Sequence, residues 1–158
     1  MASTVTAATM TVTISESITL NGKNQGGSQT ISIPSIATIS RRIVDVPASE
    51  VEIIAMSTAV ASGTFIESDV LYIRITNLDD TNHVGLIFKN ENDDEFGVKL
   101  DKGQSFIYNG DLSGGVVDTM DAQDGGADLA ANTFADLVNV TAIADTAACD
   151  VEVFVACK

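Results

Sequence analysis

The chain of 158 residues has one histidine, two cysteines and no tryptophan, which leaves few side chains for nucleophilic or metal chemistry. His83 lacks a second histidine or a nearby cysteine, so we expect a turn residue. Cys149 and Cys157 fall in one expected strand, where they would lie about 26 Å apart, too far to form a disulfide with each other. We therefore expect two buried, reduced thiols, as in a protein made in a cytoplasm.

The sequence also lacks a long apolar run. No run approaches the roughly 18 residues of a membrane-spanning helix. No basic segment precedes an apolar one at the N-terminus, as it would in a secretory signal. Hydrophobic residues nevertheless make up 45% of the chain, so its composition is not that of a disordered protein. We expect one soluble domain without a membrane partner.

Positive charge is scarce: 8 Lys and Arg stand against 22 Asp and Glu, for a net charge of -14. Between Lys102 and Lys158 there are nine acidic residues and no cation. An anionic surface repels phosphate, and the few cations form no continuous track, so we expect no nucleic-acid partner. Such a surface is typical of a protein that stays soluble at high copy number.

Alternation of apolar and polar residues predicts short strands separated by polar turns. The clearest stretch, residues 69–110, is interpreted as four consecutive antiparallel strands forming a meander with one buried face. Its turns are NLDDTN, NENDD and residues 101–103, and Gly103 to Ser105 is interpreted as a hairpin turn. The side chains expected in one buried cluster are Leu71, Ile73, Ile75, Val84, Leu86, Phe88, Phe96, Val98 and Leu100.

The remaining segments predict more short strands. A strand over residues 11–20 is interrupted near 15–17, Asn21 and Gly22 form a turn, and a long mobile loop runs to Gln29. Further strands are expected at 30–33, ended by Pro34, and at 36–46, 50–57, 116–120, 137–144 and 149–157. Residues 128–136 suit either two turns of helix or a loop.

About ten short antiparallel strands with little or no helix predict an all-β fold, a single jelly-roll-like β-sandwich. We expect residues 11–158 to form this domain. Residues 1–10 are uncharged and could form an N-terminal arm. Such a segment suits addition to the sheet edge of a neighbouring subunit.

Two acidic stretches match calcium-binding loops only in part. Asp118, Asp121, Asp124 and Asp128 recur every three or four residues, without the alternate oxygens and the twelfth-position Glu of an EF-hand. Asn90, Asn92 and Asp94 alternate, but Glu95 replaces the required glycine. Abundant acids alone do not indicate a glycosidase. We expect no enzyme, and no catalytic, cofactor-binding or metal-binding residue.

Six segments of the chain are distinctive when taken together: ITLNGKNQGG, ISIPSI, RRIVDVP, LYIRITNLDDTNHVGLIFKN, EFGVKLDKGQSFIY and CDVEVFVA. This succession resembles small virion structural proteins of tailed bacteriophages, particularly those of marine and cyanobacterial hosts. The resemblance covers about residues 10–157 and is most specific in YIRITNLDDTN and VKLDKGQSF. It implies a β fold and a place in the particle, and it implies no catalytic residue.

Such a family implies two roles. The first is a capsid decoration or cement protein on the outer surface of the virion head, with the major capsid protein and neighbouring copies of itself as partners. The alternative is a tail, neck or fibre component that recognises a host surface glycan. The absence of coiled-coil heptads and elongated repeats favours decoration. An acidic carbohydrate-binding sandwich ranks third, because the chain has only two tyrosines.

Arg41 and Arg42 are the candidate interface residues. Because they are adjacent in an expected strand, one must point to each face, so at least one points outward. On a capsid, the cation-bearing N-terminal half should face the lattice and the acidic surface of residues 111–152 should face the medium.

Overall fold

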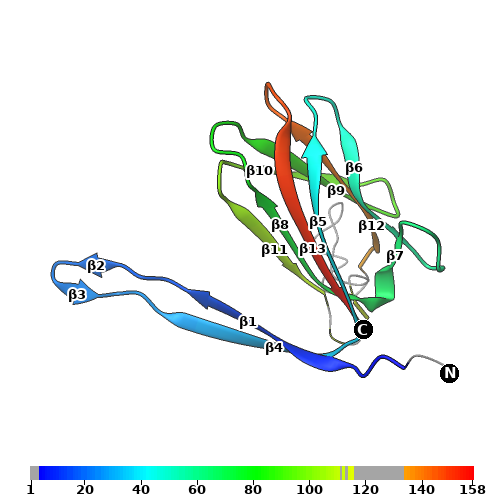
Figure 1. Cartoon of the computed structure of the whole chain (residues 1–158), viewed down its shortest axis with the longest axis horizontal. Helices are drawn as coiled ribbons and strands as arrows, with labels where there is room; N and C mark the ends of the chain where they lie inside the picture. Colours follow the sequence, from blue (N-terminus) through cyan, green and yellow to red (C-terminus); the bar gives the residue numbers. More distant parts are fainter. Residues whose placement is uncertain (1–3, 111, 113, 116–133) are drawn as a thin grey trace.

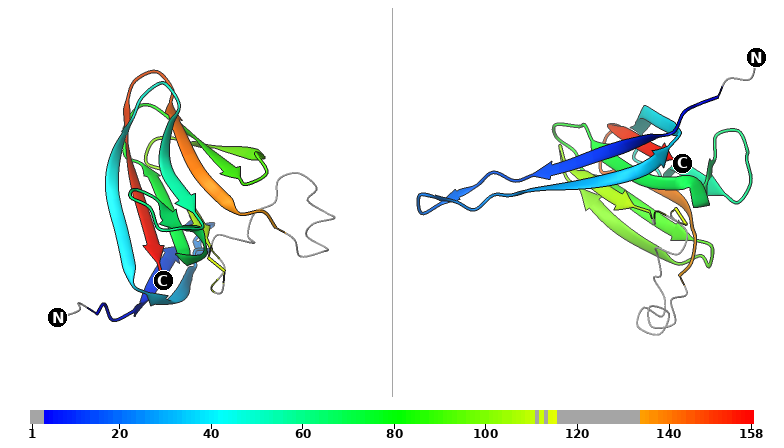
Figure 2. Two further views of the ribbon diagram at one scale, coloured as in Figure 1. Left: turned by 90° about the vertical axis from the view of Figure 1, so that its right-hand side faces the viewer. Right: turned by 90° about the horizontal axis from the view of Figure 1, so that it is seen from below.

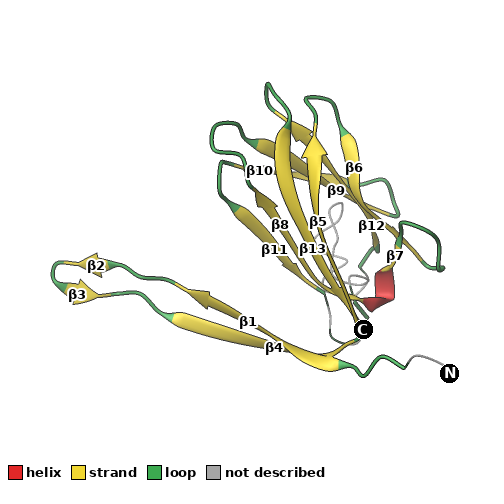
Figure 3. Ribbon diagram, in the orientation of Figure 1, coloured by secondary structure: helices red, strands yellow, loops and turns green. Residues whose placement is uncertain are grey.

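The computed structural model describes residues 4–110, 112, 114–115 and 134–158. Two packed β-sheets form a sandwich, and a long hairpin extends from one end of it (Figure 1). The only helical segment among the described residues is a three-residue 3-10 turn, Glu67–Asp69, drawn in red in Figure 3. The expected all-β sandwich with little helix is confirmed.

Among the described residues nine strands make up the two sheets of the sandwich, and eight of them follow a jelly-roll order. One sheet, here called the β13 sheet, has the order β11 (Ser105–Asn109), β8 (Val70–Asn77), β13 (Cys149–Cys157) and β5 (Thr38–Val46). The other, the β12 sheet, has the order β10 (Glu95–Leu100), β9 (Val84–Asn90), β12 (Leu137–Ala144) and β6 (Val51–Ser57). A short strand, β7 (Phe65–Ile66), lies parallel to β6.

The predicted meander over residues 69–110 is wrong, although its four strands exist. β9 and β10 pair within the β12 sheet, whereas β8 and β11 pair within the β13 sheet. The turn at Gly103 therefore carries the chain between sheets and is not a hairpin. Asn77 fixes this crossing because its N–H donates to the Gln104 carbonyl (3.0 Å), while its own carbonyl accepts from the Gly103 N–H (3.1 Å). Alternation indicates which face a residue takes, and not which strand it pairs with.

The main core lies between the two sheets; six of the nine predicted residues are buried in it, and Phe96 and Val98 are partly buried and packed against it. Phe88 is fully buried, and its ring stacks on Phe96 at 4.8 Å between centroids. The predicted register of β9 is thus confirmed. Leu71 is the exception, because it packs in a second cluster beneath the long hairpin. The register between β8 and β13 shifts at Ala156, and such an irregularity changes the alternation at the start of β8.

The long hairpin, residues 8–36, lies outside both sheets (Figure 2). β1 (Ala8–Ser15) pairs with β4 (Ser28–Ile36), and β2 (Thr19–Leu20) pairs with β3 (Lys23–Asn24) near the tip. Asn21 and Gly22 have φ values of 50° and 75°, as a type I′ turn requires, so the predicted turn is confirmed. After the turn, β3 and β4 carry the chain back with residues 25–27 between them, so the long loop expected there is wrong.

Two predicted boundaries also differ. β4 continues through Pro34 to Ile36, because it has a free edge and a register shift beside Met10, where proline is tolerated. The expected strand over residues 36–46 is divided at Ala37. The N-terminal arm expected over residues 1–10 overlaps β1, which begins at Ala8; residues 4–7 precede it and are exposed. The strand expected at 116–120, the Asp118 to Asp128 cluster and residues 128–133 lie outside the described residues.

Candidate interaction surface

The base of the long hairpin is anchored on the outer face of the β13 sheet. There an apolar cluster joins the hairpin to the sheet. Its buried members are Ile33, Ile36, Leu71, Tyr72 and Ala156, with Met10, Val12, Ile31, Ile107 and Phe154 packed against them. Burial of this apolar surface holds the base of the hairpin in place.

The distal part of the hairpin projects away from the sandwich (Figure 1). Three of its apolar side chains are exposed: Ile14 by 39%, Ile18 by 48% and Leu20 by 55%. A two-stranded hairpin alone is only marginally stable in water, because it has no second layer on which to bury its apolar side chains. The exposed side chains therefore mark this part as a surface that suits contact with another molecule.

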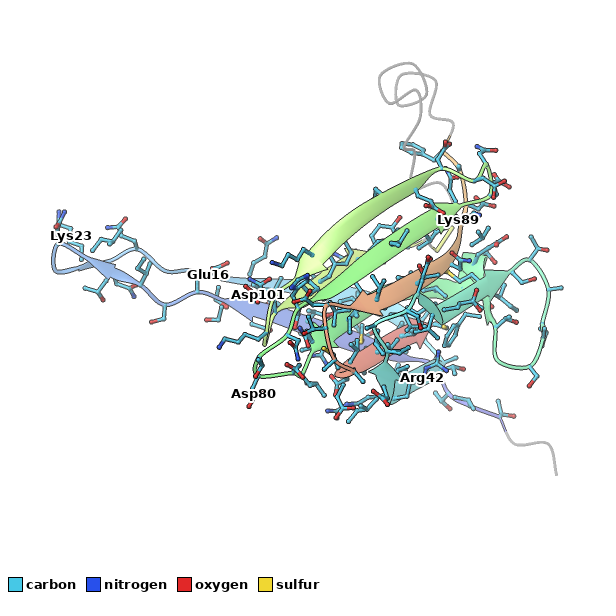
Figure 4. All side chains as sticks on the ribbon, turned by 90° about the horizontal axis from the view of Figure 1, so that it is seen from above. Glu16, Lys23, Arg42, Asp80, Lys89 and Asp101 are labelled. Carbon is cyan, nitrogen blue, oxygen red and sulfur yellow. The ribbon has the colours of Figure 1, made fainter. Side chains whose placement is uncertain are left out.

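The hairpin is electrically neutral, unlike the sandwich. Residues 1–40 contain two charged side chains, Glu16 and Lys23, whereas residues 41–158 contain seven cations and 21 acids and carry the whole net charge of -14. Figure 4 shows Lys23 at the tip and Glu16 partway along the hairpin. The neutral hairpin can therefore approach an anionic surface with less repulsion than the sandwich would meet.

The two strands approach closely near the middle of the hairpin. The Glu16 N–H donates to the Gly27 carbonyl (2.8 Å), and the Gln25 N–H donates to the Ile18 carbonyl (2.9 Å). A Cβ atom at Gly26 would lie 2.1 Å from the Glu16 carbonyl oxygen, so only glycine fits there. These contacts continue the hairpin across the interruption expected near residues 15–17.

An open groove of about 430 Å³ runs between the hairpin and the sheet. Val12 and Ile14 line it from the hairpin, and Tyr72, Arg74 and Phe154 line it from the sheet. Tyr72 is only 4% exposed and meets Phe154 edge to face, with ring centroids 6.0 Å apart. Its ring is therefore not an exposed platform for a sugar.

A charged network lies beside the groove. Glu152 is 7% exposed and accepts hydrogen bonds from two arginines: Arg41 Nε donates to Oε2 and Arg74 Nη2 donates to Oε1, each at 2.7 Å. The Arg74 guanidinium also lies 5.8 Å from the centre of the Phe154 ring. The buried carboxylate is thus paired through both of its oxygens, as a buried charge requires.

The two candidate interface arginines point to opposite faces, as alternation requires. Arg41 lies on the outer face with its side chain 67% exposed. Arg42 turns toward the other sheet and donates to the carbonyl of Ile53 in β6. Arg41 is therefore the candidate on the outer face, and Arg42 links the two sheets.

The thiols and the histidine lie where the sequence predicts them. Cys149 and Cys157 are buried and free, and burial raises the pKa of both, that of Cys157 to about 11. A raised pKa keeps a thiol protonated and poorly nucleophilic. His83 lies in the loop between β8 and β9, with Nδ1 3.5 Å from Asp145 Oδ2.

The alternating Asn90, Asn92 and Asp94 form a turn. The amide oxygen of Asn90 accepts the N–H groups of Asn92 (3.0 Å) and Asp94 (2.8 Å), so the polar residues are used to reverse the chain. Within the described ranges, no group of three or more His, Cys, Asp or Glu side chains is placed to hold a metal ion.

One buried carboxyl, that of Glu67, could not be predicted from the sequence. Glu67, in the 3-10 turn after β7, is only 5% exposed. Burial, followed by the nearby charges of Asp136 and Glu91, raises the pKa of its carboxyl. Ser68 and Asp69 follow it as in an ordinary polar turn, whereas Asp136 and Glu91, whose charges act on it, are remote in the chain.

The described arrangement is suited to protein contact: an anchored hairpin, an exposed apolar tip and an arginine on the same sheet face. No described helix is long and apolar enough to span a membrane. Comparisons with protein-family models, with curated proteins and with solved structures each find no match.

Proposed function

We propose that this chain is a non-enzymatic virion structural protein that decorates the outer capsid lattice of a tailed bacteriophage and stabilises it. The observation that carries the proposal is the long hairpin. Its base is fixed to the sandwich, while its distal part exposes Ile14, Ile18 and Leu20, which belong to neither core cluster of the described residues. Such an extension suits a cement protein, which joins neighbours in a lattice.

The charge distribution supports an orientation on the particle. The neutral hairpin and Arg41 belong to the outer face of the β13 sheet, which would meet the lattice, and Asp45, Asp150 and Glu152 are the acidic side chains that share this face. The jelly roll is also common in viral capsid proteins, which agrees with the proposal, although the fold alone does not determine a function.

The composition of the particle tests this proposal. Quantitative mass spectrometry of virions of the phage that encodes the chain should find hundreds of copies, and cryo-electron microscopy should place them on the head. A few copies confined to the tail or neck would favour the alternative role instead. Absence of the chain from purified virions would overturn both.

Attachment can be tested at Arg41. Recombinant protein should bind capsids assembled from the major capsid protein of the same genome, and Arg41→Glu should weaken that binding by about fivefold or more. Lys99→Glu is the matched control, because Lys99 is exposed on β10 in the other sheet. If Arg41→Glu and Lys99→Glu bind capsids to the same extent, Arg41 is not part of the interface.

A further inference from the structure

Two aspartates face each other on the outer side of the β13 sheet. Asp45 of β5 is the direct cross-strand partner of Asp150 of β13, and both are exposed. Like charges directly opposite each other destabilise a sheet. Among the described residues neither aspartate has an ion-pair partner, so the pair is suited to receive a cation from outside.

An uncovered apolar stripe lies on the same face. Ile39 and Ile43 are 57% and 62% exposed, and they share their side of β5 with Asp45. The chain's own hairpin covers the neighbouring part of the sheet, around Tyr72 and Phe154, and leaves this edge strand bare.

The tip of the hairpin has the complementary chemistry. Leu20 and Lys23 are cross-strand partners and share one side of the hairpin, and Ile18 directly precedes the strand that holds Leu20. Leu20 and Ile18 are about half exposed. Lys23 has no ion-pair partner among the described residues.

The two surfaces cannot meet within one chain. The hairpin leaves the sandwich where β5 begins, whereas Asp45 lies toward the opposite end of β5 (Figure 1). We propose that the hairpin tip of one copy docks on the outer face of β5 in a second copy. Leu20 and Ile18 then cover Ile43 and Ile39, and Lys23 lies between Asp45 and Asp150.

The distribution of charge supports a second copy of the chain as the partner that docks on β5. Two sandwiches that each carry -14 repel each other, and the neutral hairpin offers contact with the smallest electrostatic penalty. Because the two surfaces differ, the contact is head-to-tail, and repetition gives a ring or a chain of copies. This inference rests on the proposed function, because it names a partner for the same hairpin.

Analytical ultracentrifugation of the purified full chain tests the inference without any capsid. The chain should self-associate between about 10 μM and 1 mM, and Lys23→Glu should raise the Kd by about fivefold or more. Lys99→Glu, with the same change of charge, should leave the Kd within about twofold. Adding Asp45→Lys to Lys23→Glu restores opposite charges and the original net charge, and should recover most of the affinity.

A cross-link gives a second readout. Leu20→Cys mixed with Ile43→Cys should form a disulfide-linked dimer under mild oxidation, since the native thiols are buried. Circular dichroism would confirm that each variant is folded. A chain that stays monomeric to about 1 mM and forms no cross-link would overturn the inference, even if it still binds capsids. Self-association without capsid binding would instead count against the proposed function alone.

Discussion

Phe88 is the largest fully buried side chain among the described residues. The centroid of its ring lies 4.8 Å from the ring centroid of Phe96 in its own sheet and 4.9 Å from that of Phe106 in the opposite sheet. We predict that Phe88→Ala lowers the free energy of unfolding by about 3 to 5 kcal/mol, measured by urea denaturation. Ile143→Ala, at a site 37% exposed, is the control and should cost under about 1 kcal/mol. If Phe88→Ala and Ile143→Ala lower the free energy of unfolding equally, the described core is wrong.

Glu67 should make stability depend on pH. Its pKa in the folded protein is raised above 4.5 by burial and by Asp136 and Glu91, so the folded state holds its proton more tightly than the unfolded state. The contribution of Glu67 to the free energy of unfolding is therefore greater at low pH. It falls as the pH rises from about 4.5 through the pKa of Glu67 in the folded protein. Glu67→Gln should be more stable than the native chain at pH 7, and the difference should shrink toward pH 4.

Urea denaturation between pH 4 and pH 8 would measure this difference. Glu95→Gln, on the exposed side of β10, is the matched control and should follow the native profile. A Glu67→Gln profile parallel to the native one would show that the carboxyl is not destabilised by its surroundings.

The long hairpin divides into an anchored base and a free tip. Ser15 and Ser28 are cross-strand partners, so residues 16–27 can be replaced by an Asn-Gly turn. We predict that this shortened chain keeps its Tm within a few degrees and loses most of its attachment to capsids. Removal of residues 4–36 should instead lower the Tm strongly, because it uncovers Leu71 and Tyr72.

Thermal melting and capsid binding of these two variants would separate the roles of base and tip. If the shortened chain melts far below the native one, the tip contributes to the fold of its own chain. Unchanged attachment would show that another part of the molecule contacts the lattice.

Local patterns in the sequence predict the strands far better than their partners. Alternation gives the bounds of β12 and β13 as the structure has them, and Asn21 with Gly22 gives the turn. β13 lies between β5 and β8, more than 70 residues earlier in the chain, and no local signal encodes that pairing. Pro34 is a strand-ending signal, but it lies on a free edge with Ser35 at a φ of 64°.

In the candidate interaction surface too, the sequence predicts local features and not the contacts between distant segments. Alternation predicts that Arg41 and Arg42 point to opposite faces, but the partner that pairs with Arg41 is Glu152, 111 residues away. The anchoring of the hairpin is also nonlocal, because Val12 and Ile31 pack on residues of β8 and β13. Only the fold brings these groups together.

The net charge of -14 should make the whole molecule sensitive to salt. Excess like charge destabilises a compact state through self-repulsion, and salt screens that repulsion. We predict that the Tm rises by several degrees between about 20 mM and 500 mM NaCl in differential scanning calorimetry. An equal concentration of uncharged sorbitol would serve as the control for effects other than screening. A Tm that falls with salt would mean that attractive charge pairs dominate.

We predict no hydrolase or transferase activity for the isolated protein. One loop histidine and two buried thiols with raised pKa values do not supply a nucleophile, a base and an orienting group together. A panel of glycan and ester substrates would test this. Reproducible turnover that is lost on mutating a single acid would contradict it.

The position of β12 and β13 has a consequence for how the chain is made. They are the last two strands of the sandwich in chain order, yet each lies inside its sheet, with strands on both sides. While a ribosome is still translating them, β6 and β9 lack the strand that joins them, and so do β5 and β8. Folding of the sandwich must therefore wait until β13 has emerged, whereas the strands of the hairpin are close in the chain and can pair earlier; the base of the hairpin packs only once β8 and β13 are in place. Until then the nascent chain exposes unpaired strand edges, and this is when it would most need protection from aggregation.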